Sequence, residues 1–196
     1  MTRKPTVIAL SHQACTGGTL FTRLLAAMPR VRHLSEISAD ARPSVRFAPL
    51  APLEQFVALY GELRDEVAST VLDQVLRIAE HSAERDEALL LRLHSHSSFI
   101  ALGAPGTDTL LGLLRGRNDI DLRLLTTVRH PAASYVALLR TGWSDIGFER
   151  YCSQLGRFFD EQRGAGAPAP WHYEALVEEP DEIGRASCRE RVYVLV

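Results

Sequence analysis

Residues 6–19 read T-V-I-A-L-S-H-Q-A-C-T-G-G-T, and this stretch decides the fold class. Its first part, residues 6–10, is an apolar and partly β-branched run that is typical of a buried strand. Residues 11–19 contain two adjacent glycines, and beyond them apolar residues recur at helical spacing as far as Pro29. A strand, a glycine turn and a helix in this order bring free backbone N–H groups and a helix N-terminus together, which favours the binding of an anion.

Further along the chain, apolar runs that predict strands alternate with segments that predict helices. Strands are expected at residues 31–37, 88–91 and 122–128, and helices within residues 53–85, 107–117, 131–140 and 144–163. Residues 43–52 hold three prolines and are expected to form a loop or lid. The order predicts the α/β class, with three layers in which a parallel sheet is flanked by helices.

The glycine turn is not a Walker A motif, because that motif requires a lysine after its second glycine. Lys4 is the only lysine in the chain, and every other basic residue is an arginine. Any cationic group that holds a phosphate must therefore come from arginine, from the backbone or from a helix dipole.

The length, composition and net charge of the chain restrict the class of protein. A chain of 196 residues with 46% hydrophobic content is long enough for one domain, and a net charge of −2 argues against general nucleic-acid binding. Cys15, Cys152 and Cys188 show no paired spacing, so a reducing compartment is the simpler expectation. Near the N-terminus the apolar run is too brief for a signal peptide or a membrane span. We therefore expect a soluble, cytoplasmic protein.

The last residues of the chain differ in character from the rest. From Glu182 the sequence reads E-I-G-R-A-S-C-R-E-R-V, which resembles translated sequencing-adapter DNA. We therefore expect a domain at residues 1–181 that is truncated at its C-terminus, followed by a non-native tail at 182–196. The alternative is an ordinary basic terminal segment.

The glycine turn resembles the 5′-phosphosulfate loop of the sulfotransferase family, which usually has Lys or Arg followed by Ser-Gly-Thr-Thr. The residues at these positions here are Cys15, Thr16, Gly17, Gly18 and Thr19. The resemblance implies a fold like that of the P-loop nucleoside triphosphate hydrolases, with these five residues binding 3′-phosphoadenosine 5′-phosphosulfate (PAPS). Cys15 departs from the pattern, because it is not basic. In the family, the basic residue at this position contacts the bridging oxygen and stabilises the leaving group.

A second resemblance lies at the end of the strand expected from residue 88. Arg92-Leu93-His94 is similar to the family's Lys-Thr-His segment, whose histidine is the general base. The resemblance implies a catalytic role for His94 and Arg92, and a histidine suits the removal of a hydroxyl proton near neutral pH. His96 would share one side of an extended segment with His94, but without a third ligand at recognisable spacing we expect no metal. The alternative is that both histidines are ordinary polar residues at a strand end.

A third resemblance begins at Val128-Arg129-His130-Pro131, which is similar to the family's 3′-phosphate segment. Arg129 matches the family arginine. The family serine usually comes eight residues later, where this chain has Ala137, and Ser134 is the nearest serine. The resemblance implies a phosphate contact for Arg129 and a weaker one for Ser134. The alternative for Arg129 is a surface ion pair at a helix start.

Two shorter resemblances complete the match. Trp171-His172-Tyr173-Glu174 is similar to the family's late Tyr-Glu-Asp-Leu block and is expected to be structural. Glu36 falls where the family places a glutamate near the acceptor, although a solvated carboxylate is the default expectation there.

The resemblance implies transfer of a sulfuryl group from PAPS to a hydroxyl on a small molecule, a lipid or a sugar. One alternative is a P-loop small-molecule kinase, which would need Mg²⁺ and an acidic residue after a core strand. The expected strands end instead at Arg92-Leu93-His94 and Arg129-His130. Another alternative is a non-catalytic nucleotide-binding relative, which the replacement at Cys15 favours.

Overall fold

The computed structural model describes residues 4–37, 64–93, 95, 99, 108–142 and 145–178. Within them a five-stranded sheet has the order β2-β3-β1-β4-β5, and all of its strand pairs are parallel. The strands are β1 (Thr6–Ser11), β2 (Val31–Ile37), β3 (Ala88–Leu93), β4 (Asp121–Val128) and β5 (Trp171–His172). Every residue of the central strand β1 is buried, as its apolar sequence predicts.

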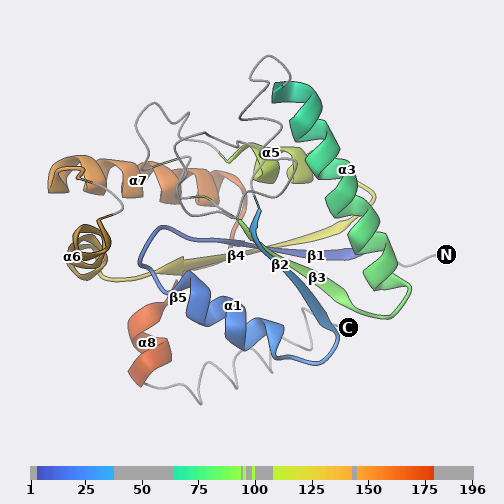
Figure 1. The fold of residues 1–196 in the computed structure, drawn as a ribbon, viewed down its shortest axis with the longest axis horizontal. Coiled ribbons are helices and arrows are strands. Elements are labelled where there is room, and N and C mark those ends of the chain that lie inside the picture. The colour runs from blue at the N-terminus through green and yellow to red at the C-terminus, as the bar shows by residue number, and fades with distance from the viewer. Residues whose placement is uncertain are drawn as a thin grey trace.

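Helices cover both faces of this sheet (Figure 1). They are α1 (Gly18–Ala26), α3 (Arg64–Ala83), α5 (Thr109–Arg115), α6 (Pro131–Thr141), α7 (Phe148–Gly164) and α8 (Tyr173–Glu178). Helices α1 and α8 lie on one face, and α3, α5 and α7 lie on the other. The predicted class is confirmed: the fold is α/β, with a parallel sheet between two helical layers.

Alternate residues of β1 enter two separate cores. Val7 and Ala9 belong to a buried cluster with residues of α3 and α5. Ile8 and Leu10 belong to a second cluster, together with Phe21 of α1. Successive side chains of a strand point to opposite faces, so one short apolar run holds helices on both sides of the sheet.

The sequence predicted most of these elements close to their observed bounds. The strand expected at 31–37 is β2, and the helix expected at 131–140 is α6, which ends one residue later. The predicted loop at 43–52 and the tail at 182–196 lie outside the described residues. In the part of the chain that is described, no helix is both long and apolar enough to cross a membrane.

The parallel register brings the carboxyl ends of the strands to one edge of the sheet. Leu10 of β1 pairs with Arg92 of β3, and Ser11 pairs with Thr126 of β4. Val128 of β4 pairs with His172 of β5. Strand β1 lies between β3 and β4 and continues into α1. The loop after β1 therefore lies at the edge where ligands bind in open α/β sheets.

Candidate functional site

The loop between β1 and α1 is a tight turn that requires both of its glycines. Gly17 is in the left-handed region with φ 87°, and a Cβ there would lie 2.4 Å from Cδ2 of Tyr173. A Cβ on Gly18 would lie 2.4 Å from Cγ of His12. Both positions therefore exclude a side chain, since such contacts are far below van der Waals distance.

The turn leaves a group of backbone donors unused. The N–H groups of Cys15, Gly17, Gly18 and Thr19 have no hydrogen-bond acceptor among the described residues. The first turn of α1 has no carbonyl of its own for such amides. Several converging N–H groups at a helix N-terminus form a site that suits a phosphate or sulfate.

Thr16 stabilises the turn from within. Its Oγ1 donates to the carbonyl oxygen of Gln13 across 2.7 Å and lies 3.3 Å from Oγ1 of Thr127 on β4. Its amide N–H also donates to the Gln13 carbonyl, at 3.3 Å. Of the five loop residues predicted to bind the cofactor, Thr16 is thus the one whose side chain is hydrogen-bonded within the protein.

Cys15 gives the loop no positive charge. Burial raises the pKa of its thiol, although the nearby charge of Arg129 partly opposes this shift. The thiol is therefore protonated and neutral near pH 7. The site must stabilise negative charge with other groups.

Arg92, at the end of β3, is a partly buried cation that contacts His12 of the loop. Its Nη2 lies 2.7 Å from a carboxylate oxygen of Glu36, and the two side chains are 13% and 32% exposed. Burial lowers the pKa of Arg92, and the attraction of Glu36 opposes that shift. The expectation of a solvated carboxylate at Glu36 is wrong, because Glu36 is paired with this guanidinium at the end of β2.

His12 joins Arg92 to the loop. Nε of Arg92 donates to Nε2 of His12 across 2.9 Å, and Nδ1 of His12 lies 3.0 Å from the carbonyl oxygen of Gln13. A carbonyl oxygen only accepts hydrogen bonds, so the network assigns the proton to Nδ1 and leaves the imidazole neutral. The ring is buried against Gly18, where it shapes the start of α1.

Arg129 follows β4 and borders the loop from the opposite side. Its Nη1 donates to the carbonyl oxygen of Cys15 across 3.3 Å, and its guanidinium carbon lies 4.6 Å from the ring centroid of Tyr173. Among the described residues no carboxylate lies within ion-pair distance of Arg129, although its charge helps to lower the pKa of Glu174. Glu174 accepts the backbone N–H of His130 across 2.9 Å, so the two segments are joined there.

Ser134 is buried between α6 and α7. Its side chain is completely buried, its hydroxyl is 2.6 Å from that of Tyr151 on α7, and it also donates to the carbonyl oxygen of Pro131. The hydroxyl therefore connects α6 to α7. Burial raises the pKa of Tyr151, which consequently stays protonated.

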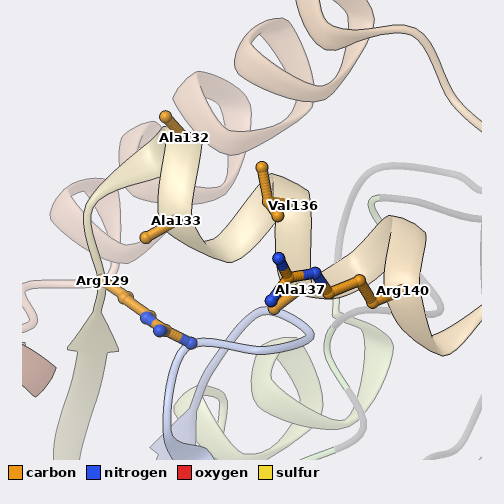
Figure 2. A pocket seen from close by; sticks show the side chains of 6 residues that line it. All are labelled: Arg129, Ala132, Ala133, Val136, Ala137 and Arg140. Atoms are coloured by element: carbon orange, nitrogen blue, oxygen red, sulfur yellow. The ribbon is translucent and has the colours of Figure 1, made fainter.

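A groove of about 430 Å³ opens along α6 beside Arg129. Its lining consists of Arg129, Ala132, Ala133, Val136, Ala137 and Arg140. Figure 2 shows the six lining side chains, with Arg129 coming from the end of β4 and Arg140 from the last turn of α6. The groove thus combines two cations with a surface of small side chains.

The predicted base, His94, lies outside the described residues, as does His96. Ser95, which lies between these two histidines in the sequence, is described. It is fully buried and donates to a carboxylate oxygen of Asp108 across 3.0 Å. Among the residues with a described position, no three His, Cys, Asp or Glu side chains are grouped so that they could hold a metal ion. The role of His94 stays a prediction.

Nine chains of solved structures are similar to this one. A crystal structure of a sulfotransferase from Alicyclobacillus acidocaldarius aligns with a TM-score of 0.49 and 18% identity, over 96% of this chain and 81% of that chain. No protein-family model matches the sequence, and no curated protein matches it. The functional assignment therefore depends on the residues of the site.

Sequence reasoning missed two polar residues of this region, His12 and Arg140. His12 lies inside the predicted phosphate loop, but its contact with Arg92 spans 80 positions and leaves no local pattern. Arg140 had a detectable signal: positions 133, 137 and 140 follow the spacing of one helical face. A search for cations one turn beyond Ala137 would have found it.

Proposed function

We propose that this protein binds PAPS and transfers its sulfuryl group to a hydroxyl acceptor. The observation that carries the proposal is the position of Arg129 beside the loop, with Nη1 3.3 Å from the carbonyl oxygen of Cys15. A loop of free amides and an arginine side by side suit a nucleotide that carries phosphate at two places.

In this proposal the loop holds the 5′-phosphosulfate. The donors are the N–H groups of Cys15, Gly17, Gly18 and Thr19, which have no acceptor in the described part of the chain. Thr19 is exposed, so its hydroxyl adds a donor at the same place. Thr16 contributes by fixing the turn through Gln13. This arrangement supplies backbone donors where a lysine is absent.

Arg129 is proposed to bind the 3′-phosphate. Its guanidinium is held by stacking on Tyr173, and a positioned guanidinium forms charge-assisted hydrogen bonds to phosphate oxygens. Ser134 was predicted as a second ligand, and its buried contact with Tyr151 supports an indirect role, in which it holds α6 against α7.

The proposed chemistry has one base and a set of charge-stabilising groups. PAPS supplies the sulfuryl group when bound. His94 accepts the proton of the acceptor hydroxyl as the hydroxyl oxygen bonds to sulfur and the bond from sulfur to the bridging oxygen breaks. The loop amides stabilise the charge that develops on the departing phosphate. The products are a sulfate ester and adenosine 3′,5′-bisphosphate.

A second candidate is nucleotide binding without catalysis. The thiol of Cys15 stands in place of a cation, and the charge of Arg92 is matched by Glu36 at 2.7 Å. Both observations reduce the positive charge available to the leaving group. This candidate has the same nucleotide preference but no turnover, so one assay separates the two.

The assay follows transfer of labelled sulfate from PAPS to a panel of small-molecule, lipid and sugar hydroxyls. The catalytic proposal predicts turnover in the natural sequence and its loss in His94→Ala, with affinity for adenosine 3′,5′-bisphosphate retained. Turnover that is unchanged in His94→Ala would eliminate His94 as the base. Selective bisphosphate binding without transfer to any acceptor would favour the non-catalytic candidate.

Two proposals concern the chain as a whole. We assign residues 1–181 to the sulfotransferase-like domain and residues 182–196 to a non-native tail, which sequencing of the natural gene tests directly. The described cysteines, Cys15 and Cys152, are free thiols, which supports a reducing compartment, and we propose the cytoplasm.

A further inference from the structure

The groove along α6 has two charged side chains, and both are cationic. Its lining contains Arg129, Arg140 and four small apolar residues, with no carboxylate. The volume of about 430 Å³ falls in the range of small-molecule sites, which is roughly 300–1,000 Å³. A groove with this lining suits an anionic group.

The two arginines reach the groove from different elements. Arg129 follows the end of β4, and Arg140 lies in the last turn of α6. Positions 133, 136, 137 and 140 share one face of the helix, and their small side chains leave room over the helix. Figure 2 shows the Arg140 side chain folded back along α6, with its guanidinium beside Ala137.

Arg140 makes no ion pair with any carboxylate that the structure describes, and its side chain is exposed. A last-turn arginine also interacts favourably with the helix dipole, but this effect acts within the helix and does not discriminate between ligands. A test of nucleotide selectivity therefore distinguishes a role of Arg140 in ligand binding from a role in stabilising the helix.

We propose that Arg140 is the second cation of the 3′-phosphate site and determines specificity for nucleotides that are phosphorylated at this position. It compensates for Ala137, which stands where the resemblance places a serine. A phosphate monoester carries close to two negative charges at neutral pH, so two guanidinium groups match it better than one. This inference rests on the proposed function, because it assumes that the nucleotide extends from the loop to the groove.

The test measures calorimetric affinity for two probes, adenosine 3′,5′-bisphosphate and adenosine 5′-monophosphate. The natural sequence is compared with Arg140→Gln, Arg140→Lys and Arg129→Gln. Arg77→Gln serves as the matched control, because it removes the same charge from an exposed position on α3. The melting temperature of each variant confirms that it is folded.

The natural sequence is expected to prefer the bisphosphate. Arg140→Gln should reduce this preference about tenfold and leave the affinity for the monophosphate unchanged, since a charged hydrogen bond to phosphate contributes on that order. Arg140→Lys should retain part of the preference, and Arg77→Gln should retain all of it. The preference should also weaken with rising salt.

Two results would overturn the inference, and they differ in meaning. If the natural sequence prefers the bisphosphate and Arg140→Gln keeps that preference, Arg140 is not part of the site and the proposed function stands. If the natural sequence shows no preference for the bisphosphate while binding the monophosphate, both the inference and the proposed function fail.

Discussion

Arg92 donates from Nε to Nε2 of His12 across 2.9 Å, and this bond joins the end of β3 to the phosphate loop. The same arginine is paired with Glu36 at 2.7 Å at the end of β2. His12 passes the connection to the carbonyl oxygen of Gln13, the acceptor that also holds Thr16. The conformation of the loop therefore depends on side chains from two neighbouring strands.

Replacing His12 tests this connection. His12→Ala removes the acceptor of a part-buried guanidinium N–H and should destabilise the protein by about 1–3 kcal/mol in urea unfolding. Affinity for adenosine 3′,5′-bisphosphate should fall as the loop loses its support. His12→Gln keeps an acceptor near the Nε2 position and should recover most of both losses. Equal losses in the Ala and Gln variants would show that packing, and not the bond to Arg92, matters.

Glu36 should give a characteristic dependence of stability on pH. Burial raises the pKa of its carboxyl above the usual 4.5, and Arg92 opposes the shift only in part. The folded state therefore holds this proton more tightly than the unfolded state, so the contribution of Glu36 to stability decreases as pH rises from 4.5 through the raised pKa.

The measurement is urea unfolding of the natural sequence and of Glu36→Gln between pH 4 and pH 7. Glu36→Gln should lack this contribution, so its stability relative to the natural sequence should increase with pH across that window. The opposite trend would mean that attraction to Arg92 outweighs burial, and the sign of the shift would be wrong.

Cys15→Lys should increase the rate of sulfuryl transfer. The neutral thiol occupies the position where the resemblance places a cation, and a positive charge there would stabilise the departing phosphate. An increase in kcat of about tenfold or more is expected, on the scale of one well-placed charged contact. Cys15→Ser removes the thiol without adding charge and should leave kcat near that of the natural sequence. A kcat for Cys15→Lys no higher than that of Cys15→Ser would contradict the argument.

Ser134 and Tyr151 should act as a structural pair. Ser134→Ala leaves a buried tyrosine hydroxyl with one partner fewer, and Tyr151→Phe does the same for the serine, so each should cost about 1–3 kcal/mol of stability. The double variant should cost less than the sum of the two. Affinity for adenosine 3′,5′-bisphosphate should change little in all three. A selective loss of bisphosphate affinity in Ser134→Ala would instead support Ser134 as a direct ligand.

Local patterns in the sequence were sufficient for most elements of the fold, although not for β5 and α8. The run at residues 6–10 and the glycines at 17 and 18 specify a strand, a turn and a helix through spacing and backbone freedom alone. The order of strands and helices then gives the α/β class. The sheet order was not predicted, because it depends on which strands pair, and neighbours such as β1 and β3 are far apart in the chain.

The site was predicted less completely than the fold, because its contacts also join residues that are far apart in the chain. Arg129 was identified through the resemblance of residues 128–131 to the 3′-phosphate segment of the sulfotransferase family. The contact of Arg129 with Tyr173 joins two positions that are far apart in the chain. The ion pair of Arg92 and Glu36 joins the ends of two strands. Neither contact leaves a periodic pattern in the sequence. A solvated carboxylate was the default expectation for Glu36, whereas the pairing of β2 with β3 brings it beside the guanidinium of Arg92. Burial and charge pairing follow from the tertiary structure.

The central claim is that the site recognises a nucleotide with phosphate at both the 5′ and 3′ positions. The most direct measurement is calorimetric titration of the protein with adenosine 3′,5′-bisphosphate, compared with ATP plus Mg²⁺. We predict that the bisphosphate binds tightly without Mg²⁺ and that Mg²⁺-ATP binds at least tenfold more weakly. Preferential binding of Mg²⁺-ATP would contradict the account and indicate a P-loop kinase.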